Sequence, residues 1–229
     1  MALAGRAIMR MAREWSGQVA WAAFLLVGVG AYAWWQWRPA PPTVIREPTV
    51  TPVPPGMFAR LNGRGPAVGF GPDTVIVFSH YACVWCVRLW RTVDSLTATG
   101  VGAPGETPTF RFRHVFDPDH APSMRAAQAA ECAARQGRFR EMSRALFLRY
   151  DSLDLVTFPA IAEEAGVPDI GAFGGCMTSE EVQASIRQDL AAAAEFQVTG
   201  TPTLVTLRVR IGGTPGPARL LALTTASGT

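Results

Sequence analysis

The sequence contains no lysine, and all 21 of its basic residues are arginines, set against 18 acidic residues. Because the arginines are scattered along the chain, we attribute this bias to genome composition rather than to function. Two of the three net positive charges lie within the first 14 residues, and the remainder of the chain is nearly neutral. A nearly neutral body lacks the basic surface that nucleic acids require. The sequence therefore predicts no nucleic-acid partner.

Charged residues of both signs are scarce, at 17% of the chain against 48% hydrophobic residues. This balance predicts a folded core and excludes a largely disordered protein. A length of 229 residues accommodates one domain of ordinary size together with appendages.

Residues 17–37 contain no charged side chain at all. As a helix this run spans about 30 Å, the thickness of the hydrocarbon core of a bilayer. Tryptophans lie near both ends and the N-terminal arginines precede the run, so we expect a signal-anchor with residues 1–16 in the cytoplasm. A signal peptide cleaved near Ala31 and Ala33 is the alternative. A buried soluble helix is disfavoured because the run is apolar on every face.

Seven prolines lie within residues 38–56. Such a segment cannot form a helix or a central strand and favours extended polyproline II structure. We expect residues 38–65 to be a spacer between a membrane anchor and a domain at residues 66–229. Recognition of a PxxP motif by a partner domain is the alternative.

The domain shows a pattern of strands and helices. The apolar run 74–79 predicts a strand buried on both faces. After Cys83, apolar residues at three- and four-residue steps predict a helix that ends at Gly100. The other expected elements are a strand at 109–116, helices from Pro122 to Leu148 with a break at Gly137, a helix at 157–166, a helix capped by Thr178 and Glu181, and strands at 203–209 and 218–224. This order predicts an α/β fold that joins a βαβ unit to a ββ unit, with helices inserted between them.

Cys83 and Cys86 form a Cys-Val-Trp-Cys pair between the predicted strand and the predicted helix. This spacing places both sulfurs on one face, one helical turn apart. The unpaired N–H groups and the dipole at the helix N-terminus favour a thiolate at Cys83. We expect Cys83 to be the exposed nucleophile and Cys86 the resolving thiol of a catalytic redox pair.

Two other interpretations of the pair remain. A single Cys-x-x-Cys can be half of a zinc site, with ligands from His80, His114 or His120, but no second cysteine pair accompanies it. A purely structural disulfide is disfavoured because so short a loop stabilises little. We therefore expect no metal and no cofactor.

Four segments in register resemble the DsbA-like thiol:disulfide oxidoreductases, and more narrowly their membrane-anchored or secreted bacterial members. These segments are VIVFSHYACVWC, AAECAARQGRF, FGGCM and VTGTPTLV. The resemblance covers about residues 66–209 and implies a thioredoxin fold with a helical insertion at about 118–176. It also implies that Pro202 is a cis-proline beside the cysteine pair and that Thr201 presents backbone to a substrate peptide.

The chain departs from the family pattern at several positions. Val84 follows the first cysteine where proline is common, and Val77 occupies a position where relatives commonly carry a buried acid. His80 is a candidate to lend positive charge to the Cys83 thiolate, and a surface histidine without a role is the alternative. The usual last helix is expected to be absent because the chain ends in a predicted strand.

Cys132 and Cys176 make an even cysteine count. In an oxidising compartment we expect them to form a structural disulfide, as some relatives do, which would stabilise the domain by about 4 kcal/mol. Two buried thiols that pack as small apolar groups are the alternative.

Together these observations predict a membrane-anchored, extracytoplasmic thiol:disulfide oxidoreductase that introduces or exchanges disulfides in exported proteins. Substrates are expected to bind as extended chains near Thr201, Pro202, Val84 and Trp85. The resemblance implies a membrane partner of the DsbB or VKOR type that reoxidises the pair. A disulfide reductase or isomerase, for example in cytochrome maturation, and a non-enzymatic metal- or peptide-binding module are the alternatives.

Overall fold

The computed structural model describes residues 26–30, 32, 49–99, 107–116 and 121–225. The chain divides into two compact units, residues 1–45 and residues 46–229. In the first unit, residues 26–30 and 32 are helical, and the rest of the predicted span 17–37 lies outside the described residues, as do residues 1–16. Among the helices that are described, none combines the length and the apolar character needed to cross a membrane.

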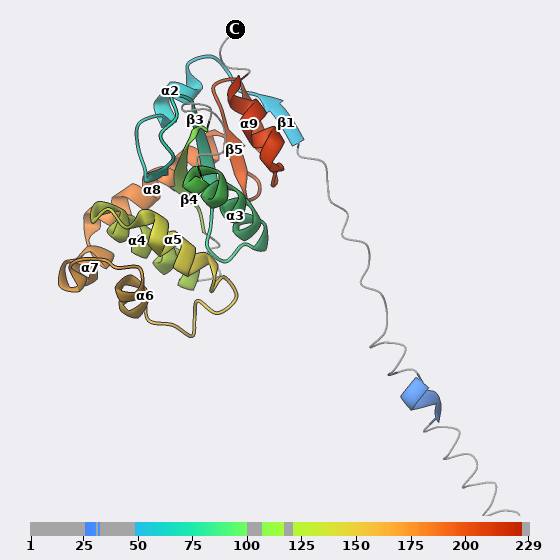
Figure 1. Cartoon of the computed structure of the whole chain (residues 1–229), viewed down its shortest axis with the longest axis vertical. Helices are drawn as coiled ribbons and strands as arrows, with labels where there is room; N and C mark the ends of the chain where they lie inside the picture. The colour runs from blue at the N-terminus through green and yellow to red at the C-terminus, as the bar shows by residue number, and fades with distance from the viewer. Residues whose placement is uncertain (1–25, 31, 33–48, 100–106, 117–120, 226–229) are drawn as a thin grey trace, which may run out of the picture. The chain divides into compact units, whose positions relative to one another are not determined.

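The described part of the second unit is built on one sheet of six strands (Figure 1). The strands are β1 (Thr49–Pro52), β2 (Ala67–Val68), β3 (Thr74–Ser79), β4 (Thr109–His114), β5 (Thr203–Val205) and β6 (Val209–Gly212). Their order across the sheet is β1-β6-β5-β3-β4-β2. The central strand β3 runs parallel to β4 and antiparallel to β5, and the other pairings are antiparallel. A parallel βαβ unit is thus joined to an antiparallel hairpin, as the sequence predicted.

Strand β3 is buried on both faces, as its apolar run predicted. Val75 and Val77 belong to the larger core, whereas Ile76 and Phe78 belong to a smaller core on the opposite face. The larger core includes the apolar side of α3 (Val84–Thr99). The smaller core includes α2 (Met57–Leu61) and the C-terminal part of α8 (Glu180–Glu195). Each face of the central strand is therefore covered by helices, which is typical of a thioredoxin fold.

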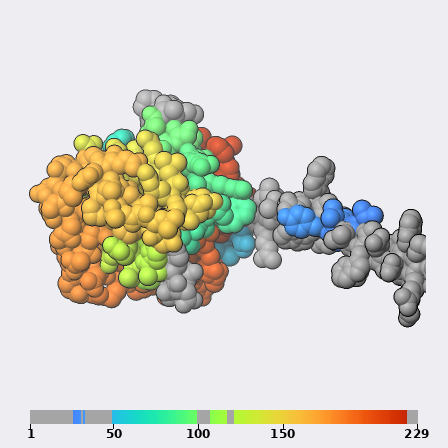
Figure 2. Space-filling view, turned by 90° about the horizontal axis from the view of Figure 1, so that it is seen from below, coloured from blue at the N-terminus to red at the C-terminus, as the bar shows by residue number. Residues whose placement is uncertain are grey.

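Between β4 and β5 the chain forms a block of helices, as predicted. The helices are α4 (Ala121–Arg135), α5 (Phe139–Phe147), α6 (Phe158–Glu164) and α7 (Ile170–Met177), followed by α8. In Figure 2 the yellow and orange surface of this block lies beside the green surface of the α3 region. Within the block, the N-cap of α8 is Ser179 rather than Thr178, because the Ser179 side chain accepts the backbone N–H of Val182.

The predicted C-terminal strand 218–224 is wrong, because residues Pro217–Thr225 form the helix α9. The segment ARLLAL consists of good helix formers, and proline is favoured in the first position of a helix. The expectation that a last helix is missing is therefore also wrong. Leu220 of α9 is fully buried in the larger core.

The predicted strand 203–209 instead contains a turn between β5 and β6. The Thr206 hydroxyl accepts the backbone N–H of Val209 at 3.1 Å, a local hydrogen bond that threonine commonly makes in turns. Further upstream, β1 and α2 lie within residues 38–65, which were expected to be a spacer. Strand β1 begins at Thr49 and pairs within the sheet, so the folded domain starts earlier than residue 66. Strand β1 lies at the edge of the sheet, where its terminal Pro52 is tolerated.

Candidate functional site

Cys83 is the last residue before α3, and Cys86 lies one turn into the helix. Both are free thiols; Cys83 is half-buried, whereas Cys86 is 1% exposed. The backbone N–H of Cys86 donates to the sulfur of Cys83 at 3.4 Å. The Cys83 sulfur therefore lies at the N-terminus of α3, where free N–H groups and the helix dipole favour negative charge.

The two thiols differ strongly in acidity. The pKa of Cys83 falls from its ordinary 9.0 to about 5, chiefly because the Cys86 thiol donates a hydrogen bond to its sulfur. The Thr201 side chain, the Cys86 N–H and the charge of His80 add to this effect and together outweigh the opposing effect of burial. Burial raises the pKa of Cys86 well above its ordinary value. The site therefore presents a thiolate at Cys83 beside a protonated thiol at Cys86.

The Thr201–Pro202 turn lies against the cysteine pair. The peptide bond between these residues is cis, and the Thr201 carbonyl oxygen lies 3.5 Å from the Cys83 sulfur. The cis-proline that the family resemblance implied is therefore present in the expected place. Thr201 is half-buried and Pro202 is buried, so the backbone of Thr201 borders the partly exposed side of Cys83.

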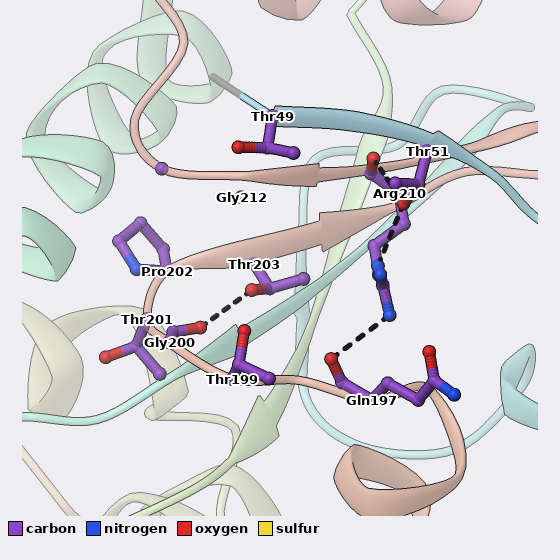
Figure 3. A pocket seen from close by; sticks show the side chains of 11 residues that line it. Thr49, Thr51, Gln197, Thr199, Gly200, Thr201, Pro202, Thr203, Arg210 and Gly212 are labelled. Atoms are coloured by element: carbon purple, nitrogen blue, oxygen red, sulfur yellow. Dashed lines mark hydrogen bonds between the residues drawn. The ribbon is translucent and has the colours of Figure 1, made fainter. Parts of the chain in front are cut away.

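A hollow of about 370 Å³ opens beside this turn (Figure 3). Thr49 and Thr51 of β1 line one side, so part of the expected spacer contributes to it. Arg210 donates to the Thr51 hydroxyl at 3.0 Å and to the Gln197 carbonyl at 3.1 Å. The remaining lining residues are Thr199, Gly200, Thr201, Pro202, Thr203, Gly212 and Gly213. The hollow is thus lined largely by hydroxyl and backbone groups, and it includes Thr201, whose carbonyl contacts Cys83.

Val84 and Trp85, between the two cysteines, are 42% and 37% exposed. The Arg88 guanidinium lies 4.5 Å from the centre of the Trp85 ring. The Thr214 hydroxyl donates to the Trp85 carbonyl at 3.1 Å. Arg88 and Thr214 were not predicted. The three-residue spacing between Trp85 and Arg88 on a helix could have indicated the first contact, whereas the second arises only from the fold.

Cys132 of α4 and Cys176 of α7 form a disulfide with their Cα atoms 5.8 Å apart. The predicted pairing is therefore present, and it joins two helices of the inserted block. Within the part of the chain that the structure describes, no three His, Cys, Asp or Glu side chains are grouped so that they could hold a metal ion. His120, one of the alternative metal ligands, lies outside the described residues.

Strand β3 supplies no acidic side chain to the buried side of the cysteine site. Val77 is fully buried at the position where relatives commonly carry an acid. Ser79, two residues further along the same face of the strand, hydrogen-bonds the Cys86 thiol. The sequence analysis missed Ser79, although the alternation of Val75, Val77 and Ser79 indicates which face it occupies.

Comparison with known families and structures supports this architecture. Residues 70–223 match the family model described as Thioredoxin. A periplasmic thioredoxin-like protein from Salmonella enterica serovar Typhimurium is 18% identical, with a TM-score of 0.61 over 76% of this chain and 97% of that chain. A thioredoxin-like oxidoreductase from Silicibacter pomeroyi is 25% identical, with a TM-score of 0.58 over 73% of this chain and 94% of that chain. The thiol-disulfide exchange protein alpha-DsbA2 from Wolbachia pipientis is 14% identical, with a TM-score of 0.62 over 75% of this chain and 94% of that chain.

The similar curated proteins are much longer than this chain. The Na(+)/H(+) antiporter NhaA 1 of Mycolicibacterium gilvum is 29% identical over 168 residues, which cover 72% of this chain and 26% of the antiporter. The chain thus spans about a quarter of the length of this relative, and the similarity concerns one part of it.

Proposed function

The chain belongs to the thioredoxin family and has a DsbA-like fold, and on this basis we propose that it is a thiol–disulfide oxidoreductase acting on cysteines of other proteins. One observation carries the proposal. The half-buried Cys83 lies at the N-terminus of α3, where the backbone N–H of Cys86 donates to its sulfur at 3.4 Å and its pKa is lowered to about 5. A low-pKa thiol with a second thiol one turn away is the arrangement that disulfide exchange requires.

The exchange proceeds in two steps from the oxidised pair. A substrate thiolate attacks the Cys83 sulfur, a mixed disulfide forms, and Cys86 leaves with the electron pair and takes up a proton. A second substrate thiolate then attacks the substrate sulfur of the mixed disulfide, and Cys83 leaves as the stabilised thiolate. The substrate gains a disulfide, and its two electrons remain on Cys83 and Cys86. The reverse sequence reduces a substrate disulfide.

Substrates bind as extended chains along the Thr201–Pro202 turn and the exposed side chains of Val84 and Trp85. The Thr201 backbone borders Cys83 and offers hydrogen-bonding groups to a peptide. The exposed Trp85, held by Arg88 and Thr214, offers an apolar surface on the other side.

The domain acts outside the cytoplasm, anchored to a membrane by residues 17–37. The Cys132–Cys176 disulfide supports this proposal because structural disulfides persist mainly in oxidising compartments. In such a compartment a membrane protein of the DsbB or VKOR type would reoxidise the Cys83–Cys86 pair.

The preferred direction is oxidation of substrates. The lowered pKa of Cys83 stabilises the reduced pair, which makes the disulfide form a stronger oxidant. Equilibration with glutathione gives the reduction potential directly. A value near −120 mV supports an oxidase, whereas a value near −270 mV supports a reductase.

Oxidative refolding of reduced ribonuclease tests the activity itself. We expect the wild-type chain to accelerate the recovery of ribonuclease activity and the Cys83→Ala variant to lose this effect. The Cys132→Ala/Cys176→Ala double variant, measured at a temperature at which it is folded, is the control and should retain the activity. Full activity of Cys83→Ala would instead support a binding module without thiol chemistry.

A further inference from the structure

A buried pair of ionisable side chains, His114 and Glu131, lies next to the cysteine site and has no role in the exchange described above. His114 Nε2 lies 3.3 Å from Glu131 Oε1, and the two side chains are 3% and 10% exposed. Burial of such a pair is unfavourable unless its members hold each other in place. Buried ionisable groups of this kind often serve a nearby site.

The sheet places His114 beside the residue that contacts Cys86. Ser79 and His114 are register partners in the parallel pairing of β3 and β4, so their side chains lie next to each other on one face. That face carries the larger core, which includes Cys86. Val75 and Val77 of β3 and Phe110 and Phe112 of β4 belong to the same core. The Ser79 hydroxyl hydrogen-bonds the Cys86 thiol. On this face, the strand register places Ser79 and His114 between Cys86 and Glu131.

The other ionisable groups around His114 form their side-chain interactions with groups other than the imidazole. From α8, Asp189 accepts the backbone N–H of His114 at 2.8 Å and pairs with Arg113 at 3.1 Å. The Tyr81 ring lies 5.9 Å from the His114 ring, and the Tyr81 hydroxyl is hydrogen-bonded to Ser143 at 2.8 Å. Burial raises the pKa of Tyr81 far above the neutral range, so it stays protonated.

The pKa of Glu131 is set by two opposing effects, burial and the interaction with His114. Burial acts to raise the pKa of Glu131, but the interaction with His114, whose Nε2 lies 3.3 Å from Glu131 Oε1, outweighs it and holds this pKa below its ordinary value. Arg135 and Arg113 contribute in the same direction. Glu131 is therefore an anion that lies against the imidazole ring of His114 and holds its orientation.

The Cys86 thiol must lose a proton each time it attacks a mixed disulfide and regain one in the reverse step. At 1% exposure, and with a pKa raised by burial, it has little access to bulk water. We propose that His114, oriented by Glu131, takes and returns the proton of Cys86 through the Ser79 hydroxyl. This inference rests on the proposed exchange function and assigns it a proton-transfer route.

In the step itself, the proton of Cys86 passes to Ser79 while the Ser79 proton passes to a nitrogen of His114, which becomes an imidazolium paired with Glu131. The Cys86 thiolate then attacks the Cys83 sulfur of the mixed disulfide. The bond between Cys86 and Cys83 forms, and the substrate sulfur leaves with the electron pair of the broken bond. The pair is oxidised by two electrons and the substrate disulfide is reduced. The imidazolium afterwards releases its proton to the leaving thiolate or to solvent.

Stopped-flow reaction of the reduced protein with Ellman's reagent separates the two thiols. Cys83 releases the first thionitrobenzoate, and Cys86 releases the second when it attacks the mixed disulfide. In His114→Gln we expect the second release to slow by about tenfold or more at neutral pH, because proton transfer by a placed side chain typically contributes at least that much. The first release should change by less than about twofold, and the pH profile of the second should move to higher pH.

Three further variants distinguish proton transfer from a structural effect. Ser79→Ala is expected to slow the second release as His114→Gln does, and Glu131→Gln to slow it less. Ser143→Ala, which removes the hydrogen bond to Tyr81 in the same buried region, should leave both releases unchanged. If His114→Gln does not fold, Ser79→Ala and Glu131→Gln carry the test.

The proposal is overturned if the second release keeps its wild-type rate and pH profile in the folded variants. It is also overturned if Ser143→Ala slows that release as much as His114→Gln, since the effect would then be a general disturbance of the core. Absence of any thionitrobenzoate release at Cys83 in the wild-type protein would instead contradict the exchange function on which the inference rests.

Discussion

The backbone N–H of Cys86 points at the sulfur of Cys83 across 3.4 Å. This contact follows from the start of α3 at Val84, because a residue just before a helix faces the free N–H groups of its first turn. The negative charge on Cys83 is therefore stabilised by groups that the fold itself holds in place.

The first prediction concerns the pH dependence of Cys83. We expect its alkylation by iodoacetamide to follow a thiolate with a midpoint near pH 5, against 9.0 for an unperturbed thiol. Because the folded pKa is the lower one, ionisation of Cys83 stabilises the reduced fold fully above the unfolded value of 9.0. This contribution is lost as the pH falls through about 5. Mass spectrometry of alkylated Cys83 measures the midpoint, and a value near 9 would contradict the site geometry.

The second prediction concerns Trp85. In Trp85→Ala we expect the kcat/KM for a cysteine-containing peptide to fall by about tenfold, because an exposed aromatic surface beside Cys83 is lost. The rate of the small Ellman's reagent should stay the same, since it does not need that surface. A parallel loss with both reagents would show that the substitution disturbs Cys83 instead of substrate binding.

The third prediction concerns the Cys132–Cys176 disulfide, which joins residues separated by 44 positions. Replacing both cysteines by alanine should lower the free energy of unfolding by about 2–4 kcal/mol, since a loop of this length gains entropy in the unfolded chain. Urea unfolding of the double variant measures the loss. The Glu195→Ala variant, which removes only a surface ion pair, is the control and should stay within about 1 kcal/mol of the wild type.

The fourth prediction contrasts two acids of α8. Asp189 and Arg113 are almost fully buried, so Asp189→Ala leaves a buried guanidinium without its partner and should destabilise the fold by about 3–5 kcal/mol. Glu195 pairs with Arg60 at 2.9 Å on the surface, and Glu195→Ala should cost less than about 1 kcal/mol. Urea unfolding of both variants checks this, and equal losses would contradict the assigned burial.

The predictable elements were those whose pattern is contained in a short stretch of the sequence. The apolar run of β3, the helix after Cys83 and the turn before Pro202 each carry a local pattern that depends on few distant contacts. The cysteine pair could be identified for the same reason, because its spacing places it at the start of a helix. The roles of Thr201 and Pro202 came from family resemblance, and the structure places the Thr201 carbonyl 3.5 Å from the Cys83 sulfur.

Except for α9, the parts that were missed depend on distant contacts. Residues 217–225 have the composition of a helix, but the strand prediction followed from an incorrect boundary for the preceding hairpin. Strand β1 lies in a proline-rich segment and pairs with β6, which is distant in the sequence. The pairs His114–Glu131 and Arg113–Asp189 join residues 17 and 76 positions apart, and no local pattern indicates such contacts.

Trapping of the mixed disulfide tests the central claim most directly. The Cys86→Ala variant is mixed with a one-cysteine peptide that is supplied as its disulfide-linked dimer. The Cys83 thiolate should displace one peptide thiolate and accumulate a covalent adduct, which peptide mapping should place on Cys83. The Cys83→Ala variant should form no adduct, and addition of a reductant should release the peptide. An adduct on Cys132 or Cys176, or equal adduct formation in the Cys83→Ala variant, would contradict the account.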